Sequence, residues 1–383
     1  MGRIEKITPF IVMEILEKAK ELERLGRDIV HMEIGEPDLP PSPKVLEAVE
    51  KYKDKAYGYT HSLGIPELRE AIAAYYWDTY RVNVSPDRVI ITTGTSGAFS
   101  LIFSALFEPG EGIVLTDPGY PCYKNFGAVY CLEVETVDID ASTNYQLTAE
   151  MLDEFGGFFV KHYKGFIVTS PSNPIGNVYD EFTLRGLAEY ASRQGLFFIS
   201  DEIYHGLNYE KEVHTALEFS DEAIVVNGFS KYFCMPGFRL GWVIVPERFV
   251  RPMQLVAQNL FISPPTLSQY AALAALEDRE YLKKVKETFR RRRDFLYSEL
   301  KNLFDIEVEP QGAFYIWARI DRYSTDSFKF AHQLLEKAGV AVTPGVDFGK
   351  NNTGRYIRFA YTNRIERLKE GVQRIRRFLE ENF

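Results

Sequence analysis

The sequence is poor in cysteine and has no long apolar run. Its three cysteines are Cys122, Cys131 and Cys234, and no Cys-x-x-Cys pair occurs. This odd, sparse set supports neither a disulfide framework nor a zinc site, so a reducing, cytoplasmic location is expected. No run approaches the roughly 18 apolar residues that cross a bilayer. The opening MGRIEKITPF also lacks the apolar core of a signal peptide, so no membrane partner is expected.

An excess of positive charge is also missing. The chain has 45 Lys and Arg against 54 Asp and Glu, which gives a formal net charge of −9. Nucleic acids and anionic membranes select basic surfaces, so neither is expected as a partner. The six histidines fit no metal-ligand spacing, and no metal is expected.

A linker is absent as well. At roughly 150 residues per domain, a chain of 383 residues should hold two or three domains. No Gly/Ser tract, Pro-rich spacer, charge block or repeat divides it. The boundary between the domains is therefore unmarked in the sequence.

The middle of the chain contains a series of short apolar runs rich in Val, Ile and Phe. They are RVIITT (88–93), GIVLTD (112–117), FIVTS (166–170), LFFISD (196–201) and AIVVNG (223–228). Strands buried on both faces show such runs instead of a clean alternation. Helix-like stretches separate several of the runs, which predicts an α/β domain with a mostly parallel sheet.

Helical patterns flank these runs, and the character of the chain changes after about residue 279. Helices are predicted over 11–25, 66–80, 182–195, 280–303, 326–338 and 364–381. Strand-like segments are IEVEP (306–310) and AFYIWARI (313–320).

Polar residues follow the apolar runs, where ligands of open α/β sheets bind. TGTSGA (93–98) is a Gly-flanked turn that opens a helix, which suits a phosphate. Asn173 follows one run, and Asp201 ends another, where a buried acid needs a cation or a strong donor. Lys231 follows the last run. Taken singly, Asn173 also fits an Asx turn and Lys231 a surface lysine, and the neighbouring Glu202 fits a helix-initiating acid.

With Tyr204 and Arg239, the residues form the set that pyridoxal 5'-phosphate requires. Its aldehyde needs a lysine, its ring nitrogen a carboxylate and its ring oxygen hydrogen-bond donors. Its phosphate needs an arginine fork and backbone N–H groups.

The order of the motifs resembles the class I (aspartate/aromatic-type) aminotransferases among the fold-type I pyridoxal-phosphate enzymes. The resemblance covers nearly the whole chain. Its segments are GEPD (35–38), GIPELR (64–69), TGTSGA (93–98), PSNPIG (171–176), SDEIY (200–204) and SKYFCMPGFRLGW (230–242).

The resemblance implies a two-domain α/β fold. A three-layer large domain with a mostly parallel sheet is expected over 45–285, where it binds pyridoxal phosphate. A smaller α+β domain is expected from both chain ends, residues 1–44 and 286–383. The helix at 280–303 would then be a stiff joint, which explains the missing linker.

The resemblance also implies catalytic roles. Lys231 is expected to form the Schiff base with the cofactor and to shuttle the proton. Asp201 is expected to keep the ring nitrogen protonated, and Asn173 and Tyr204 to bond the ring hydroxyl.

Further residues are expected to bind cofactor and substrate. The cofactor phosphate is assigned to Thr95, Ser96, Ser230 and Arg239, and stacking on its ring to Tyr120. Tyr59 is expected to reach the phosphate in the partner subunit of a homodimer. The substrate carboxylate is assigned to Gly35, Asn173 and Arg358.

The expected activity is ping-pong transamination between an L-amino acid and a 2-oxo acid. A carbon–sulfur β-lyase on the same fold is the alternative, and a ligand sensor of a transcription regulator is a third reading that the acidic charge disfavours. Some relatives that use aspartate carry an arginine for the distal carboxylate, whereas others bind it with different residues; VAQNLFISPP (256–265) contains no arginine. The 23 Tyr and 28 Phe residues slightly favour aromatic or branched substrates.

Overall fold

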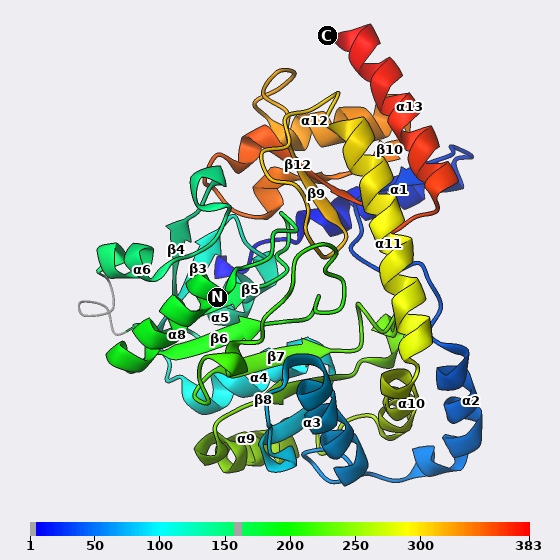
Figure 1. Ribbon diagram of the computed structural model, residues 1–383. Coiled ribbons are helices and arrows are strands. Elements are labelled where there is room, and N and C mark those ends of the chain that lie inside the picture. The colour runs from blue at the N-terminus through cyan, green and yellow to red at the C-terminus, as the bar shows by residue number, and fades with distance from the viewer. Residues whose placement is uncertain (1–4, 157–162) are drawn as a thin grey trace.

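A seven-stranded sheet forms the centre of the computed structural model, which describes residues 5–156 and 163–383 (Figure 1). Strand β8 runs antiparallel to both of its neighbours, and every other neighbouring pair is parallel. In spatial order the strands are β2 (Val89–Thr92), β8 (Gly241–Ile244), β7 (Ile224–Gly228), β6 (Phe197–Asp201), β5 (Tyr163–Thr169), β3 (Gly112–Asp117) and β4 (Glu133–Asp138). The predicted α/β class with a mostly parallel sheet is confirmed.

Helices cover both faces of this sheet, which makes the three expected layers. Successive strand residues face opposite sides, so Ile199 packs in one core and Phe198 in the other. The helices on the Ile199 side are α4 (Gly94–Leu106), α5 (Pro121–Val129) and α9 (Glu247–Leu260). Those on the Phe198 side are α3 (Pro66–Tyr80), α8 (Glu181–Gln194) and α10 (Thr266–Glu277). Burial on both faces is the reason that the strands appear as unbroken apolar runs.

A second group of elements combines the two ends of the chain. Val30 in β1 (Val30–His31) pairs with Val340 in β10 (Val340–Ala341). Beside them lies a three-stranded sheet of β11 (Thr343–Pro344), β12 (Tyr356–Ala360) and β9 (Tyr315–Arg319). The helices of this group are α1 (Ile11–Arg24), α12 (Ser327–Gln333), the π-helix η7 (Leu334–Ala338) and α13 (Ile365–Asn382). Residues from α1, β1, β9 and α13 share one apolar core.

The long helix α11 (Arg279–Leu300) runs along one side of the molecule, from α10 to the group formed by the chain ends (Figure 1). Its Arg292 donates to both carboxylate oxygens of Asp38, at 2.6 and 2.9 Å, and so holds the GEPD loop. Within the described ranges, no helix is both long and apolar enough to cross a membrane.

Several segments differ from the prediction, and three of them are instructive. IEVEP (306–310) is not a strand: isolated bridges flank it, from Asp305 to Arg319 and from Gly312 to Asn208, but none lies within it. Glu307 instead accepts hydrogen bonds from the hydroxyls of Tyr145 and Tyr356. Sequence patterns also missed α2 (Pro43–Tyr52) and the edge strand β4, whose half-exposed residues form no apolar run.

Candidate active site

The carboxyl ends of β5, β6 and β7 open onto one cavity of about 280 Å³. Every residue predicted for the site except Tyr59 lines it. These residues are Gly35, Thr95, Ser96, Tyr120, Asn173, Asp201, Tyr204, Ser230, Lys231, Arg239 and Arg358. Tyr59 lies on the surface, where its side chain is 81% exposed. The parallel strands explain the convergence, because their carboxyl ends meet at one edge of the sheet.

One end of the cavity suits an anion. Helix α4 begins at Gly94, so Thr95 and Ser96 lie in its first turn, where backbone N–H groups and the helix dipole attract negative charge. The guanidinium of Arg239 lies against the same turn. A Cβ at Gly94 would come within 2.8 Å of Arg239 Nη2, and the φ of this residue is +66°, so glycine lets the two approach.

Lys231 lines the same cavity. Its Nζ donates a hydrogen bond of 2.7 Å to the carbonyl oxygen of Gly35. Burial lowers the pKa of Lys231 to about 8; Arg358 and Arg239 act in the same direction, and Glu36 opposes them. The neutral, nucleophilic form of this amine is therefore much more populated near neutral pH than that of an ordinary lysine.

A buried carboxylate faces the cavity from the end of β6. Asp201 accepts hydrogen bonds from the Tyr123 hydroxyl at 2.5 Å and from the Ile203 N–H at 3.1 Å. Burial raises the pKa of Asp201 to about 6, although both donors oppose the rise. Asp201 forms no ion pair with any described residue. A cationic ligand beside it would relieve the cost of burying this charge.

Arg358 brings β12 to the same cavity. Its guanidinium donates to Asn173 Oδ1 at 2.8 Å, to the carbonyl of Glu33 at 2.5 Å and to Thr343 Oγ1 at 3.1 Å. The side chain is buried, and Nε has no hydrogen-bond partner among the residues that the structure describes. Arginine forks bind carboxylates with two hydrogen bonds, so this site suits a carboxylate ligand.

Two tyrosines were missed by the sequence reading. Tyr123 bonds Asp201, and the Tyr315 hydroxyl lies 2.8 Å from that of Tyr204. The Tyr315 ring also lies under the Arg358 guanidinium, 4.2 Å from its centre. Among so many aromatic residues, no sequence signal distinguished these two.

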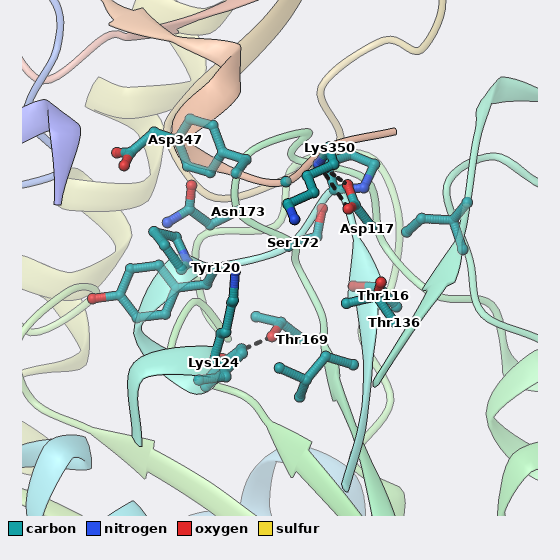
Figure 2. A pocket seen from close by; sticks show the side chains of 18 of the residues that line it. Thr116, Asp117, Tyr120, Lys124, Thr136, Thr169, Ser172, Asn173, Asp347 and Lys350 are labelled. Carbon is teal, nitrogen blue, oxygen red and sulfur yellow. Dashed lines mark hydrogen bonds between the residues drawn. The ribbon is translucent and has the colours of Figure 1, made fainter. Parts of the chain in front are cut away.

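A second, larger cavity of about 600 Å³ adjoins the first (Figure 2). The two share Tyr120, Tyr123, Thr169 and Asn173 as walls. A ligand held in the first cavity can therefore extend into the second.

Comparisons with known proteins agree with this geometry. Residues 27–375 match the family described as aminotransferase class I and II. The chain is 40% identical to the (5-formylfuran-3-yl)methyl phosphate transaminase of Methanocaldococcus jannaschii, with 98% of each chain covered. It is 36% identical to the valine–pyruvate aminotransferase of Mycobacterium tuberculosis, with 96% of each covered.

A solved structure supports the fold in the same way. The aspartate aminotransferase of Thermus thermophilus with maleate superposes with a TM-score of 0.92 at 32% identity, covering 98% of each chain. These relatives are all transaminases, and the lyase alternative is not favoured. The chain therefore belongs to the class I and II aminotransferases of fold type I.

Proposed function

We propose that this aminotransferase binds pyridoxal 5'-phosphate in the 280 Å³ cavity and moves an amino group between an L-amino acid and a 2-oxo acid. The observation that carries the proposal is the convergence of Lys231, Asp201 and Arg239 on one cavity. The residues fit the cofactor: Arg239 and the first turn of α4 suit its phosphate. Asp201, a buried acid without an ion-pair partner among the described residues, suits its protonated ring nitrogen.

The other residues of the first cavity would orient the cofactor. Asn173 and Tyr204 would bond the ring hydroxyl, and Tyr120 would stack on the ring. Ser230 would join Thr95, Ser96 and Arg239 at the phosphate. When bound, pyridoxal phosphate supplies an aldehyde that takes up the amino group and an electron-withdrawing ring that weakens the substrate Cα–H bond.

Lys231 and Arg358 would act on the substrate. The guanidinium of Arg358, with Asn173 and the backbone at Gly35, would hold the α-carboxylate. The Cα–H bond would then lie within reach of Lys231 Nζ, the amine that removes the proton in its neutral form. Burial favours this neutral form by lowering the Lys231 pKa to about 8.

A half-reaction screen tests this function. The purified protein, loaded with pyridoxal phosphate, is mixed with each of the twenty amino acids while the absorption of the cofactor is followed. We expect donors to convert the aldehyde form of the cofactor to the amine form, and a 2-oxo acid to reverse the change. Release of pyruvate and ammonia from a cysteine thioether, without an oxo-acid acceptor, would contradict the proposal and identify a β-lyase.

We further propose the domain division of 45–285 against 1–44 with 286–383. The pairing of β1 with β10 and the shared core of α1, β9 and α13 support it. The site then lies between domains, because Gly35 and Arg358 come from one and Lys231 and Asp201 from the other.

A homodimer is also part of the proposal, with Tyr59 completing the partner's site. Large apolar side chains are exposed around this tyrosine: Tyr57 is 90% exposed, and Leu260 and Ile262 are more than half exposed. Thr266 Oγ1 donates to the carbonyl of Gly58 at 2.7 Å, which places the two exposed segments side by side. Exposed apolar groups of this kind mark interaction surfaces.

Mixed dimers test the role of Tyr59. Tyr59→Ala and Lys231→Ala chains are each expected to have little activity. Refolded together, they should recover about a quarter of wild-type activity, because half of the dimers are mixed and each has one intact site. No recovery on mixing, with dimers verified by mass, would mean that Tyr59 does not act across the interface.

A further inference from the structure

We propose that the ion pair of His31 and Glu33 positions Arg358 for the substrate α-carboxylate, by fixing the backbone carbonyl that holds its guanidinium. Neither His31 nor Glu33 is among the described residues that line the two cavities, so both act through Arg358 as positioning residues. The inference rests on the proposed function, because it takes Arg358 as the residue that binds the carboxylate.

The backbone carbonyl of Glu33 holds one end of the Arg358 guanidinium. It accepts a hydrogen bond from Arg358 Nη2 at 2.5 Å and another from Thr343 Oγ1 at 2.9 Å. Thr343 Oγ1 also accepts from the same Nη2, at 3.1 Å. Arg358 Nε has no partner among the described residues and is left for a ligand. Because carboxylate binding by an arginine fork depends on its angle, the place of this carbonyl affects substrate binding.

The segment that carries this carbonyl is bonded on both sides of Glu33. The carbonyl of Met32 accepts from the N–H of Ala360 at 2.7 Å. The carbonyl of Gly35 accepts from Lys231 Nζ at 2.7 Å. A shift of the segment would therefore reach both the arginine and the lysine of the cavity.

The side chain of Glu33 anchors the same segment from within the protein. Residues two apart in an extended chain point to the same side, so Glu33 meets His31, and Glu33 Oε1 lies 2.7 Å from His31 Nδ1. The Glu33 side chain is fully buried, and its Oε2 has no hydrogen-bond partner among the described residues. A buried carboxylate with one such partner depends on that partner for its charge balance and its position.

His31 lies between two carboxylates, which favours its imidazolium form. Its Nε2 is 3.1 Å from Oε1 of Glu23 on α1, opposite the contact to Glu33. The hydrogen bond with Glu33 raises the pKa of His31; burial opposes the rise, and Glu23 adds to it. The imidazolium can donate to both carboxylates at once, whereas the neutral ring can donate to only one.

Other charged groups around His31 are paired elsewhere. Lys20 on α1 lies 2.9 Å from the second carboxylate oxygen of Glu23. On α13, which packs against β1, two arginines pair with Asp28. These are Arg367 and Arg374. The neighbouring strand β10 is apolar. The charge of His31 therefore responds chiefly to the two glutamates.

Binding of a carboxylate that cannot react tests the positioning. Hexanoate is titrated calorimetrically into the enzyme loaded with pyridoxal phosphate. His31→Gln leaves the buried Glu33 without its cation, and Glu33→Gln removes the charge but keeps the shape. We expect each to raise the dissociation constant of hexanoate at least about three-fold, within the range caused by residues that do not touch the ligand.

His214→Gln is the matched control. His214 Nδ1 pairs with Glu218 at 2.9 Å, and neither residue is among the described ones that line the cavities. This variant should bind hexanoate as the wild type does. Circular dichroism selects folded variants. If the buried Glu33→Gln does not fold, His31→Gln still decides, because the His31 side chain is 25% exposed.

Half-reaction rates separate positioning from a general effect on the fold. Norleucine and pentylamine differ only in the carboxylate. In His31→Gln and Glu33→Gln, KM for norleucine should rise at least about three-fold with a smaller change in kcat. The half-saturating concentration of pentylamine should stay within about two-fold. Equal changes for both donors would mean a structural role and would overturn the proposal.

A double-mutant cycle tests whether His31 acts through Arg358. Arg358→Lys keeps the charge and loses the fork. Adding His31→Gln to Arg358→Lys should then lower kcat/KM for norleucine no further. A loss of the same size in both backgrounds would show that His31 acts by another route.

The pH profile tests the charge of the pair. His31 is an imidazolium below its raised pKa, so the wild-type KM for norleucine should rise as the pH passes above that pKa. Lys231 titrates in wild type and variant alike, so the ratio of their KM values is compared. The ratio of His31→Gln to wild type should be largest at low pH and shrink as His31 loses its proton. A ratio that does not change with pH would overturn the role of the ion pair.

Wild-type hexanoate binding in both variants would also overturn the proposal. If the wild type then still converts norleucine, transamination by this enzyme stands and only the positioning role fails. If no amino acid reacts with the wild type, the proposed function fails, while hexanoate binding still decides whether the pair positions Arg358.

Discussion

Lys231→Ala is expected to lower the rate of the half-reaction by at least about a thousand-fold, within the range lost with a positioned general base. Of the described residues that line the 280 Å³ cavity, Lys231 is the only lysine, so no second amine can bind the cofactor aldehyde or take the Cα proton. The absorption band of the lysine-bound cofactor should also disappear. A variant that keeps both the band and the turnover would contradict the proposed role.

Small amines provide the control for Lys231→Ala. If the variant lacks only an amine, added methylamine should restore part of the rate, whereas a misfolded protein would not respond. Circular dichroism should show an unchanged fold, because within the described ranges the lysine side chain makes a single hydrogen bond, to the Gly35 carbonyl.

The pH dependence of cofactor capture follows from the same amine. Burial lowers the pKa of Lys231 to about 8, so its ammonium form dominates below pH 8 and the neutral form above it. The rate at which the cofactor-free protein captures pyridoxal phosphate should rise up to about pH 8 and then level off. An ordinary lysine, with a pKa near 10.4, would give a rate that continues to rise.

Asp201→Asn is expected to lower kcat about a hundred-fold or more, the loss typical when a fixed electrostatic partner of the reaction is removed. The side chain keeps its shape but loses the charge that would hold the cofactor ring nitrogen protonated. Substrate binding at Arg358 does not involve this carboxylate, so KM should change much less than kcat.

The same substitution is expected to stabilise the cofactor-free protein at pH 7.5. Burial raises the Asp201 pKa from 3.8 to about 6, so the folded state binds the proton more tightly than the unfolded state. The resulting cost to stability is absent below about pH 4 and complete above about pH 6. Two pKa units correspond to about 3 kcal/mol. Urea unfolding should show a gain of up to this size; a loss would contradict the buried charge.

Glu202→Gln is the matched control for Asp201→Asn. Glu202 is the next residue, is equally buried and accepts hydrogen bonds from Ser200, Thr215 and the N–H of Ala216. Burial raises the Glu202 pKa to about 8, so the carboxyl is already mostly protonated at neutral pH and glutamine resembles it. Its kcat should stay within a few-fold of the wild type.

The sequence alone predicted the elements whose surroundings are uniform. The strands β2, β3, β5, β6 and β7 are buried on both faces. Apolar residues are therefore favoured at nearly every position, whichever helix packs against the strand. The edge strand β4 and the IEVEP segment were not predicted correctly. Their conformation depends on solvent exposure and on contacts with distant residues, and not on the local residue types alone.

The site residues also fall into two groups: those that the sequence predicted and those that only the structure revealed. Lys231, Asp201, Asn173 and Arg239 could be named from sequence because each lies near the end of a strand in a recognisable motif, and their roles stay predictions. The Tyr123 hydroxyl on Asp201 and the Tyr315 ring under Arg358 depend on how α5 and β9 pack against the large sheet. Local sequence thus determined which chemistry the chain carries, whereas tertiary packing, which no local pattern encodes, decided which side chains tune it and what shape of substrate it can hold.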